Sequence, residues 1–157
     1  MADLVTTISD IVTLNGQSRG STNSTTQSGI TDVYERIVLC AHSNTTTVAV
    51  FAASPHASAG NVTIDRDRTK YIRVTNLSDA EVMDIAVVTT NTNYQVVLTA
   101  GNSHILCQAD TTAIGEEDTS PAFGTLENIT SIQVRPRGSA DVPVSYTHLT
   151  LPTNREV

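Results

Sequence analysis

Apolar and polar residues alternate along much of this chain, in short segments that turn-forming residues separate. The first segment, LVTTISDIVTLNG, places Leu4, Ile8, Val12 and Leu14 on one side of an extended chain, together with the acidic Asp10. This period of two predicts a β-strand with one largely apolar face, which ends at the Asn15-Gly16 turn.

Residues 17–29, QSRGSTNSTTQSG, contain no apolar residue. Small, polar and glycine residues of this kind predict a flexible connector. Residues 1–29 are therefore expected to form an N-terminal extended arm, a strand on a Ser/Thr-rich tether. The apolar face of that strand can be buried in its own sheet or at the sheet edge of a neighbouring subunit. In the second case the subunit contacts are made by Leu4, Ile8, Val12 and Leu14.

Strand-length runs rich in β-branched residues follow one another between residues 30 and 143. They include ITDVYERIVLCA, TTTVAVFAA, TKYIRVTNL and AEVMDIAVVTT. Two further runs flank Ala100-Gly101-Asn102 and predict a hairpin, because Gly and Asn tolerate the positive φ angles of tight turns. Roughly nine short strands without an amphipathic helix predict an all-β fold, an antiparallel β-sandwich or jelly-roll-like single domain over residues 30–143.

Residues 144–153, VSYTHLTLPT, resemble one reading frame of the transposon-end adapter that is used to build short-read sequencing libraries. On this interpretation residues 144–157 are a non-native tail, and the native sequence after Val144 is missing. Tyr146 and His148 then carry no functional information. The alternative is a genuine last strand followed by a Pro-containing end.

Length and charge narrow the class of protein. A chain of 157 residues fits one domain with a sizeable core. The net charge of −7 argues against nucleic acid as a direct partner, because phosphate binding needs clustered Lys and Arg. No apolar stretch approaches the length of a membrane helix, and the first residues lack the pattern of a signal peptide. We therefore expect a soluble chain with no membrane partner.

Candidate catalytic chemistry is sparse. The chain has no nucleophile elbow, phosphate-binding loop or calcium-loop pattern. A solvated loop is expected at the acidic triplet, which consists of Glu116, Glu117 and Asp118. A weak cation site is the alternative. The histidines outside the tail are His42, His56 and His104, and their spacing does not suggest a metal site. We expect neither an enzyme nor a cofactor.

Two other residue types leave alternatives open. Buried free thiols are expected for Cys40 and Cys107, and one disulfide between them is the alternative. The chain also contains five glycosylation sequons, at Asn23, Asn44, Asn61, Asn76 and Asn128. In a secreted protein these asparagines would carry glycans.

Three groups of residues resemble motifs of small virion structural proteins from metagenomic tailed phages. The first group is Ile72, Val74 and Asn76, the second is Leu98, Gly101 and Ser103, and the third is Ile129, Ile132, Asp141, Val142 and Val144. The resemblance implies a non-enzymatic capsid-decoration or head or tail accessory protein. The resemblance further implies that the protein is assembled in the host cytoplasm and is located in the virion. Its implied partners are copies of itself and a major capsid or tail protein. Pro143 departs from the acidic or polar residue expected there.

Two other classes of function remain open. One is a subunit of a prokaryotic extracellular surface filament, in which residues 4–14 would be a donated strand. The other is a cupin-like jelly-roll enzyme or binding module. That class would need two or three histidines and a carboxylate that converge inside the barrel.

Overall fold

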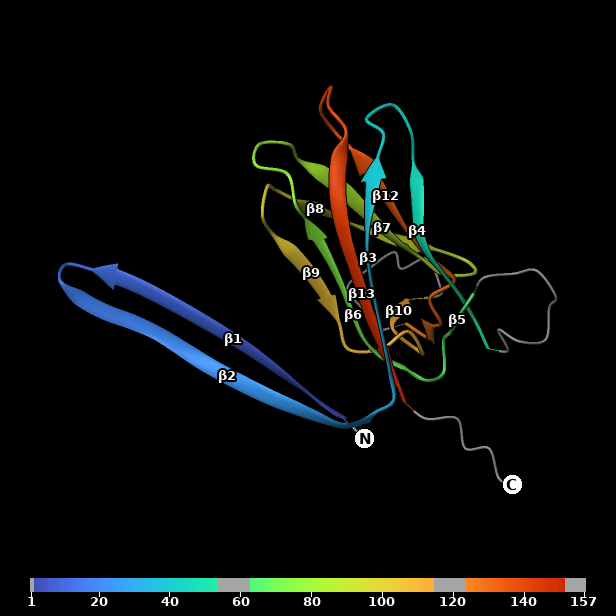
Figure 1. The fold of residues 1–157 in the computed structure, drawn as a ribbon, viewed down its shortest axis with the longest axis horizontal. Helices are drawn as coiled ribbons and strands as arrows, with labels where there is room; N and C mark the ends of the chain where they lie inside the picture. Colours follow the sequence, from blue (N-terminus) through green and yellow to red (C-terminus); the bar gives the residue numbers. More distant parts are fainter. Residues whose placement is uncertain (1, 54–62, 115–123, 152–157) are drawn as a thin grey trace.

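The chain folds into a two-layered body from which a long hairpin projects (Figure 1). The computed structural model describes residues 2–53, 63–114 and 124–151, and these residues form strands and no helix. Within those ranges there is accordingly no helix that could span a membrane. The prediction of an all-β domain with an extended arm is confirmed.

The body consists of two sheets with a jelly-roll strand order. One sheet has four strands, in the spatial order β3 (Asp32–Cys40), β13 (Val142–Thr150), β6 (Thr69–Asn76) and β9 (Ser103–Leu106). The other has five, in the order β5 (Ile64–Asp65), β4 (Thr46–Ala52), β12 (Ser131–Pro136), β7 (Met83–Val88) and β8 (Asn93–Leu98). Apart from the short β5, the eight main strands follow the antiparallel double Greek key of a jelly roll. A separate short pair is formed by β10 (Ala113–Ile114) and β11 (Leu126–Glu127).

The core lies between the two sheets and follows from the alternation in the sequence. In β7, buried Met83, Ile85 and Val87 alternate with half-buried residues. In β12, Ile132 and Val134 are fully buried in the same cluster, which β6 and β13 complete from the other sheet. Successive residues of a strand point to opposite faces, so each strand supplies the core with every second side chain.

The predicted hairpin around residues 100–102 is wrong. The turn itself is present, because Gly101 has a φ of 75° and the amide of Asn102 donates to the Thr99 carbonyl over 3.1 Å. However, β8 pairs with β7 in one sheet, and β9 pairs with β6 in the other. The turn therefore carries the chain from one layer of the sandwich to the other. The alternation shows that two strands follow each other but not that they share a sheet.

The predicted flexible connector at residues 17–29 is also wrong. These residues belong to β2 (Gln17–Ile30), which pairs antiparallel with β1 (Ala2–Leu14) along nearly its whole length. The Asn15-Gly16 turn joins the two strands with φ angles of 51° and 75°, as a tight hairpin requires. Hydroxyl pairs also link the strands, Thr7 to Ser24 over 2.8 Å and Ser9 to Thr22 over 2.9 Å. A strand can thus be polar throughout when backbone pairing and β-branched threonines favour it.

The tail residues 145–150 lie inside β13, between β3 and β6 at the centre of the four-stranded sheet. Five buried side-chain atoms of the described residues have no hydrogen-bond partner, and three of them belong to Tyr146, Thr147 and His148. Unpartnered polar atoms are costly in a dry interior. The polar sequence of this strand therefore suits its buried place poorly. The proposed non-native origin of residues 144–157 stays a prediction.

Replacing Tyr146 by phenylalanine is expected to raise the free energy of unfolding by about 1 kcal/mol. The substitution removes a buried hydroxyl that lacks a partner and keeps the ring in place. Urea denaturation measures the effect, and Tyr34→Phe is the matched control, because the Tyr34 side chain is 44% exposed and its hydroxyl is not one of the buried unpartnered atoms. A loss of stability in Tyr146→Phe would contradict the expectation.

Candidate functional site

The hairpin of residues 2–30, called the arm from here on, exposes apolar side chains away from the body. The predicted contact residues Leu4, Ile8, Val12 and Leu14 share one face of β1, as the sequence indicated. Ile8 is 56% exposed and Val12 58%, and Leu14 near the tip is exposed too. Leu4 differs, because it packs at the base of the arm against a cluster formed by Ile30, Tyr71 and Leu149. Their role in subunit contact stays a prediction.

The opposite face of β1 also carries exposed apolar residues, which the sequence reasoning missed. Val5 is exposed, and Ile11 is 77% exposed. Both occupy odd positions in the sequence, whereas the predicted contact residues were chosen from the even positions alone. A count of apolar residues on each face of the strand would have found them. β1 is thus apolar on both sides, whereas residues 17–29 of its partner strand contain no apolar residue.

A second exposed apolar surface lies on β3, the edge strand of the four-stranded sheet. Its outward face carries the exposed Glu35, which pairs with Arg73 over 3.8 Å. The other three side chains of this face are apolar and largely exposed: Val33, Ile37 and Leu39. Among the described residues, β3 is paired with another strand on one side only, and that strand is β13. Unpaired edges with apolar side chains are places where another chain can add a strand. The sequence could not reveal this feature, because it does not indicate which strand ends a sheet.

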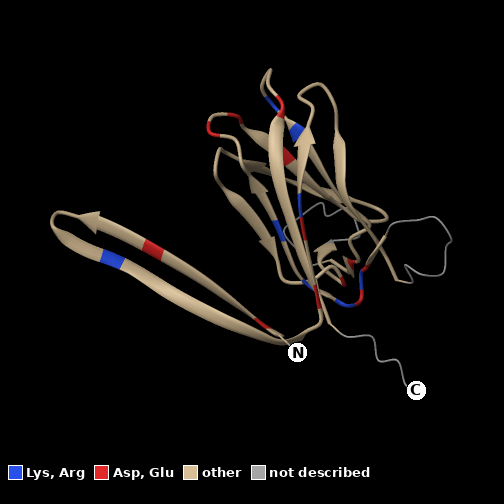
Figure 2. Cartoon of the chain, viewed as in Figure 1, with Lys and Arg blue, Asp and Glu red and all other residues tan. Residues whose placement is uncertain are grey.

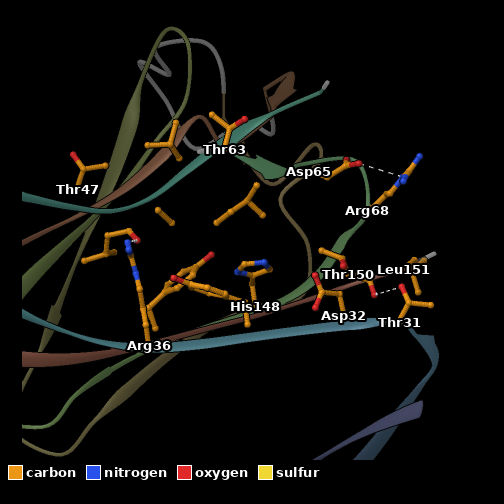
Figure 3. A pocket seen from close by; sticks show the side chains of 16 residues that line it. Thr31, Asp32, Arg36, Thr47, Thr63, Asp65, Arg68, His148, Thr150 and Leu151 are labelled. Carbon is orange, nitrogen blue, oxygen red and sulfur yellow. Dashed lines mark hydrogen bonds and ion pairs between the residues drawn. The ribbon is translucent and has the colours of Figure 1, made fainter. Parts of the chain in front are cut away.

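Beneath β3, a cavity of about 510 Å³ opens between the edges of the two sheets (Figure 3). Its walls come from β3 and β13 on one side and from β4 and β5 on the other. Apolar side chains such as Val48 and Ile64 line it beside charged ones. Arg36 reaches into it from β3, and its guanidinium donates a hydrogen bond to the Val48 carbonyl. At the far end Arg68 pairs with Asp65 over 3.2 Å.

The floor of the cavity includes the two tail residues Tyr146 and His148. The His148 ring stacks on Tyr34 at 5.3 Å between centroids. Burial lowers the pKa of His148 and raises the pKa of Tyr146. Because residues 144–157 are predicted to be non-native, we rest no functional claim on these two side chains. The native β3 residues that face the cavity, Tyr34 and Arg36, remain.

The other residues that the sequence analysis considered for chemistry lie apart from this cavity. His42 pairs with Asp141 over 2.9 Å, and this hydrogen bond lowers the pKa of the Asp141 carboxyl. His104 contacts the Tyr94 hydroxyl over 3.2 Å, and burial lowers its pKa. Neither residue lines the cavity, and His56 and the triplet at 116–118 fall outside the described residues. Across the described ranges, no three His, Cys, Asp or Glu side chains gather as a metal-binding group.

The structure also shows whether the two cysteines and the sequon asparagine Asn76 are buried. Cys40 and Cys107 are both free thiols, but only Cys40 is buried, which corrects the expectation for Cys107. Asn76 is fully buried, and its amide donates to the carbonyls of Glu81 and Leu98 over 2.8 and 3.2 Å. A glycan cannot be attached to this side chain in the folded protein. Asn61 lies outside the described residues.

Charged side chains are few along the arm, as Figure 2 shows. The arm carries only Asp3, Asp10 and Arg19 in its described residues, so apolar and hydroxyl groups make up most of its surface. Comparisons with protein-family models, curated proteins and solved structures found no match for this chain.

Proposed function

We propose that this protein is a non-enzymatic structural protein that works by self-assembly, as a capsid-decoration or head or tail accessory subunit of a phage virion. The observation that carries the proposal is the arm, whose apolar side chains are exposed on both faces of β1. Its partners are copies of itself and, in the particle, a major capsid or tail protein.

The arm of a single copy has few contacts that stabilise it in water. A two-stranded hairpin is marginally stable by itself, because neither face has a layer of side chains to pack against. Among the described residues, the arm packs against the body at its base, where Leu4 and Ile30 contact Tyr71. Burial of Ile8, Val12 and Ile11 against another chain would stabilise the arm and join the two chains at the same time.

The virion part of the proposal is supported by the resemblance of the strand and turn motifs in residues 72–144 to small virion proteins. A jelly-roll body is compatible with it, since this fold is used by viral capsid proteins, among other classes. The surface-filament alternative relies on a single donated strand. Here β1 is already paired with β2, so the unit available for exchange is a hairpin.

We expect the double substitution Ile8→Lys/Val12→Lys to prevent self-assembly. Light scattering across a concentration series should show the parent chain growing beyond its monomer mass of 16.7 kDa and the variant staying at that mass. Two charged groups in a desolvated contact should weaken it at least about a hundredfold.

The matched control is Asn23→Lys/Gln27→Lys, which adds the same charge at the same spacing to the same face of the arm, on its polar strand and not opposite Asp10. This control should assemble like the parent. A parent chain that remains monomeric at every concentration, or an Ile8→Lys/Val12→Lys variant that assembles normally, would contradict the proposed self-assembly.

A further inference from the structure

We propose that the free edge of β3 in one copy receives β1 from the arm of a second copy, with Asp10 of the incoming strand beside Arg36 of the receiving strand. This inference rests on the proposed function and assigns the surface to which the arm binds. It follows from the shape of the body, the distribution of apolar residues on the arm, the connection between the arm and β3, and the charge at the middle of each of the two strands.

The body has room for a strand beside β3. In the five-stranded sheet β5 lies beyond β4, whereas in the four-stranded sheet no described strand lies beyond β3. The cavity of about 510 Å³ opens at this place, and its lining includes Val48 and Val50 of β4 and Ile64 of β5. A strand added to β3 would gain backbone hydrogen bonds along the edge and cover the mouth of the cavity.

β1 suits this place better than β2. A strand added at the edge has one face toward the cavity and the other beside the outward row of β3, where Glu35 stands among the apolar Val33, Ile37 and Leu39. Each face therefore meets apolar side chains, and β1 has exposed apolar side chains on both of its faces. Residues 17–29 have none. The 13 residues of β1 span about 43 Å, which exceeds the roughly 30 Å of the nine residues of β3.

The strand has to come from a second copy because of the short connection before β3. Thr31 alone separates β2 from β3, and its amide is held by the Thr150 carbonyl over 3.1 Å. If the arm folded back onto its own body, β2 would lie beside β3, and β1 would lie on the far side of β2. Figure 1 shows instead that the arm leads away from the body. The free edge of β1 can therefore reach the β3 edge of another molecule.

Charges at the middle of each strand complement each other. Arg36 lies midway along β3 and faces the cavity, and it makes no ion pair with a carboxylate in the described part of the chain. Its neighbours on the same face of β3, two residues away, are Tyr34 and Val38. Asp10 is the only acid on its face of β1, where Ile8 and Val12 flank it in the same way.

With Asp10 opposite Arg36, apolar side chains therefore meet apolar ones on both sides of the ion pair. This matching holds whether β1 runs parallel or antiparallel to β3, because each charged residue has an apolar or aromatic side chain two residues away on either side. Directly opposed residues of opposite charge, and β-branched residues opposite aromatic ones, both stabilise paired strands.

Charge reversal tests this pairing with the full-length chain. Asp10→Arg and Arg36→Asp, each alone, should raise the concentration at which half of the protein assembles at least about tenfold, because like charges then meet. The double variant, and an equimolar mixture of the two single variants, should return to within about threefold of the parent. Asp3→Arg is the matched control, since it makes the same charge change at the base of β1, beyond the end of β3 in the proposed pairing, and should leave assembly unchanged.

Each outcome bears on the inference. Single reversals that assemble like the parent, or a double variant no better than the weaker single one, would overturn binding at β3. The proposed function would still stand if Ile8→Lys/Val12→Lys blocked assembly. If circular dichroism shows that Arg36→Asp is unfolded, Arg36→Gln replaces it, because glutamine keeps a donor for the Val48 carbonyl. In an Arg36→Gln background, Asp10→Asn should then cause no further loss, and a further loss would overturn the pairing.

Discussion

Replacing Ile132 by alanine is expected to lower the free energy of unfolding by about 2–5 kcal/mol. Ile132 lies in β12, in the middle of the five-stranded sheet, and its side chain is fully buried between the two layers. Truncation removes three carbon atoms from a close-packed interior and leaves a cavity that the flanking strands β4 and β7 can close only in part. Urea denaturation followed by circular dichroism measures the change.

The control for this prediction is Ile37→Ala, which makes the same chemical change at a side chain that is 68% exposed. Its effect on unfolding should stay within about 0.5 kcal/mol. Both variants should be compared at a protein concentration below that of assembly, because association stabilises the folded state by mass action. Equal losses in the two variants would mean that Ile132 is not in the interior.

The sequence predicted those features of the fold that depend on local pattern. Alternation in residues such as Met83, Ile85 and Val87 correctly indicated strands with one buried face. The Asn15-Gly16 pair correctly indicated a tight turn, since both residues adopt positive φ angles. These predictions succeeded because side-chain periodicity and turn chemistry are properties of neighbouring residues.

Features that depend on distant pairing were missed. β2 has no apolar residue in its first thirteen positions and is a strand only because β1 lies beside it. Residues 93–106 contain two strands around a turn, and nothing local indicates that they enter different sheets. The same limit applies to the candidate site. Ile8 and Val12 could be selected from the sequence, but Arg36 acquires its role only because β3 is an edge strand.

Asn76 illustrates how a local motif can mislead. The residues Asn76-Leu77-Ser78 form a sequon, which by itself indicates an exposed loop. In the fold the Asn76 side chain is buried and organises the turn that follows β6. Its amide group donates to Glu81 and Leu98, and its carbonyl oxygen accepts from the amide of Ser78 over 3.0 Å. The same three residues therefore specify a structural hydrogen-bond network.

Replacing Asn76 by aspartate is accordingly expected to destabilise the fold by about 3–5 kcal/mol at neutral pH, the cost of an uncompensated buried charge. The carboxylate keeps the bond from the Ser78 amide, but its second oxygen faces the carbonyls of Glu81 and Leu98, to which it cannot donate. The exposed Asn44→Asp is the matched control and should cost little.

The destabilisation by Asn76→Asp should depend on pH in a direction that identifies its cause. Burial and the two carbonyls favour the protonated carboxyl, so the pKa of Asp at this position should lie above its unfolded value of about 3.9. The folded state then binds more protons than the unfolded state between those two pKa values, and stability falls as the pH rises through that interval. The loss relative to the parent should be smallest below about pH 4, where a protonated carboxyl can donate to one carbonyl. Urea titrations at several pH values measure this, and a loss that does not change with pH would show that shape, rather than charge, limits this position.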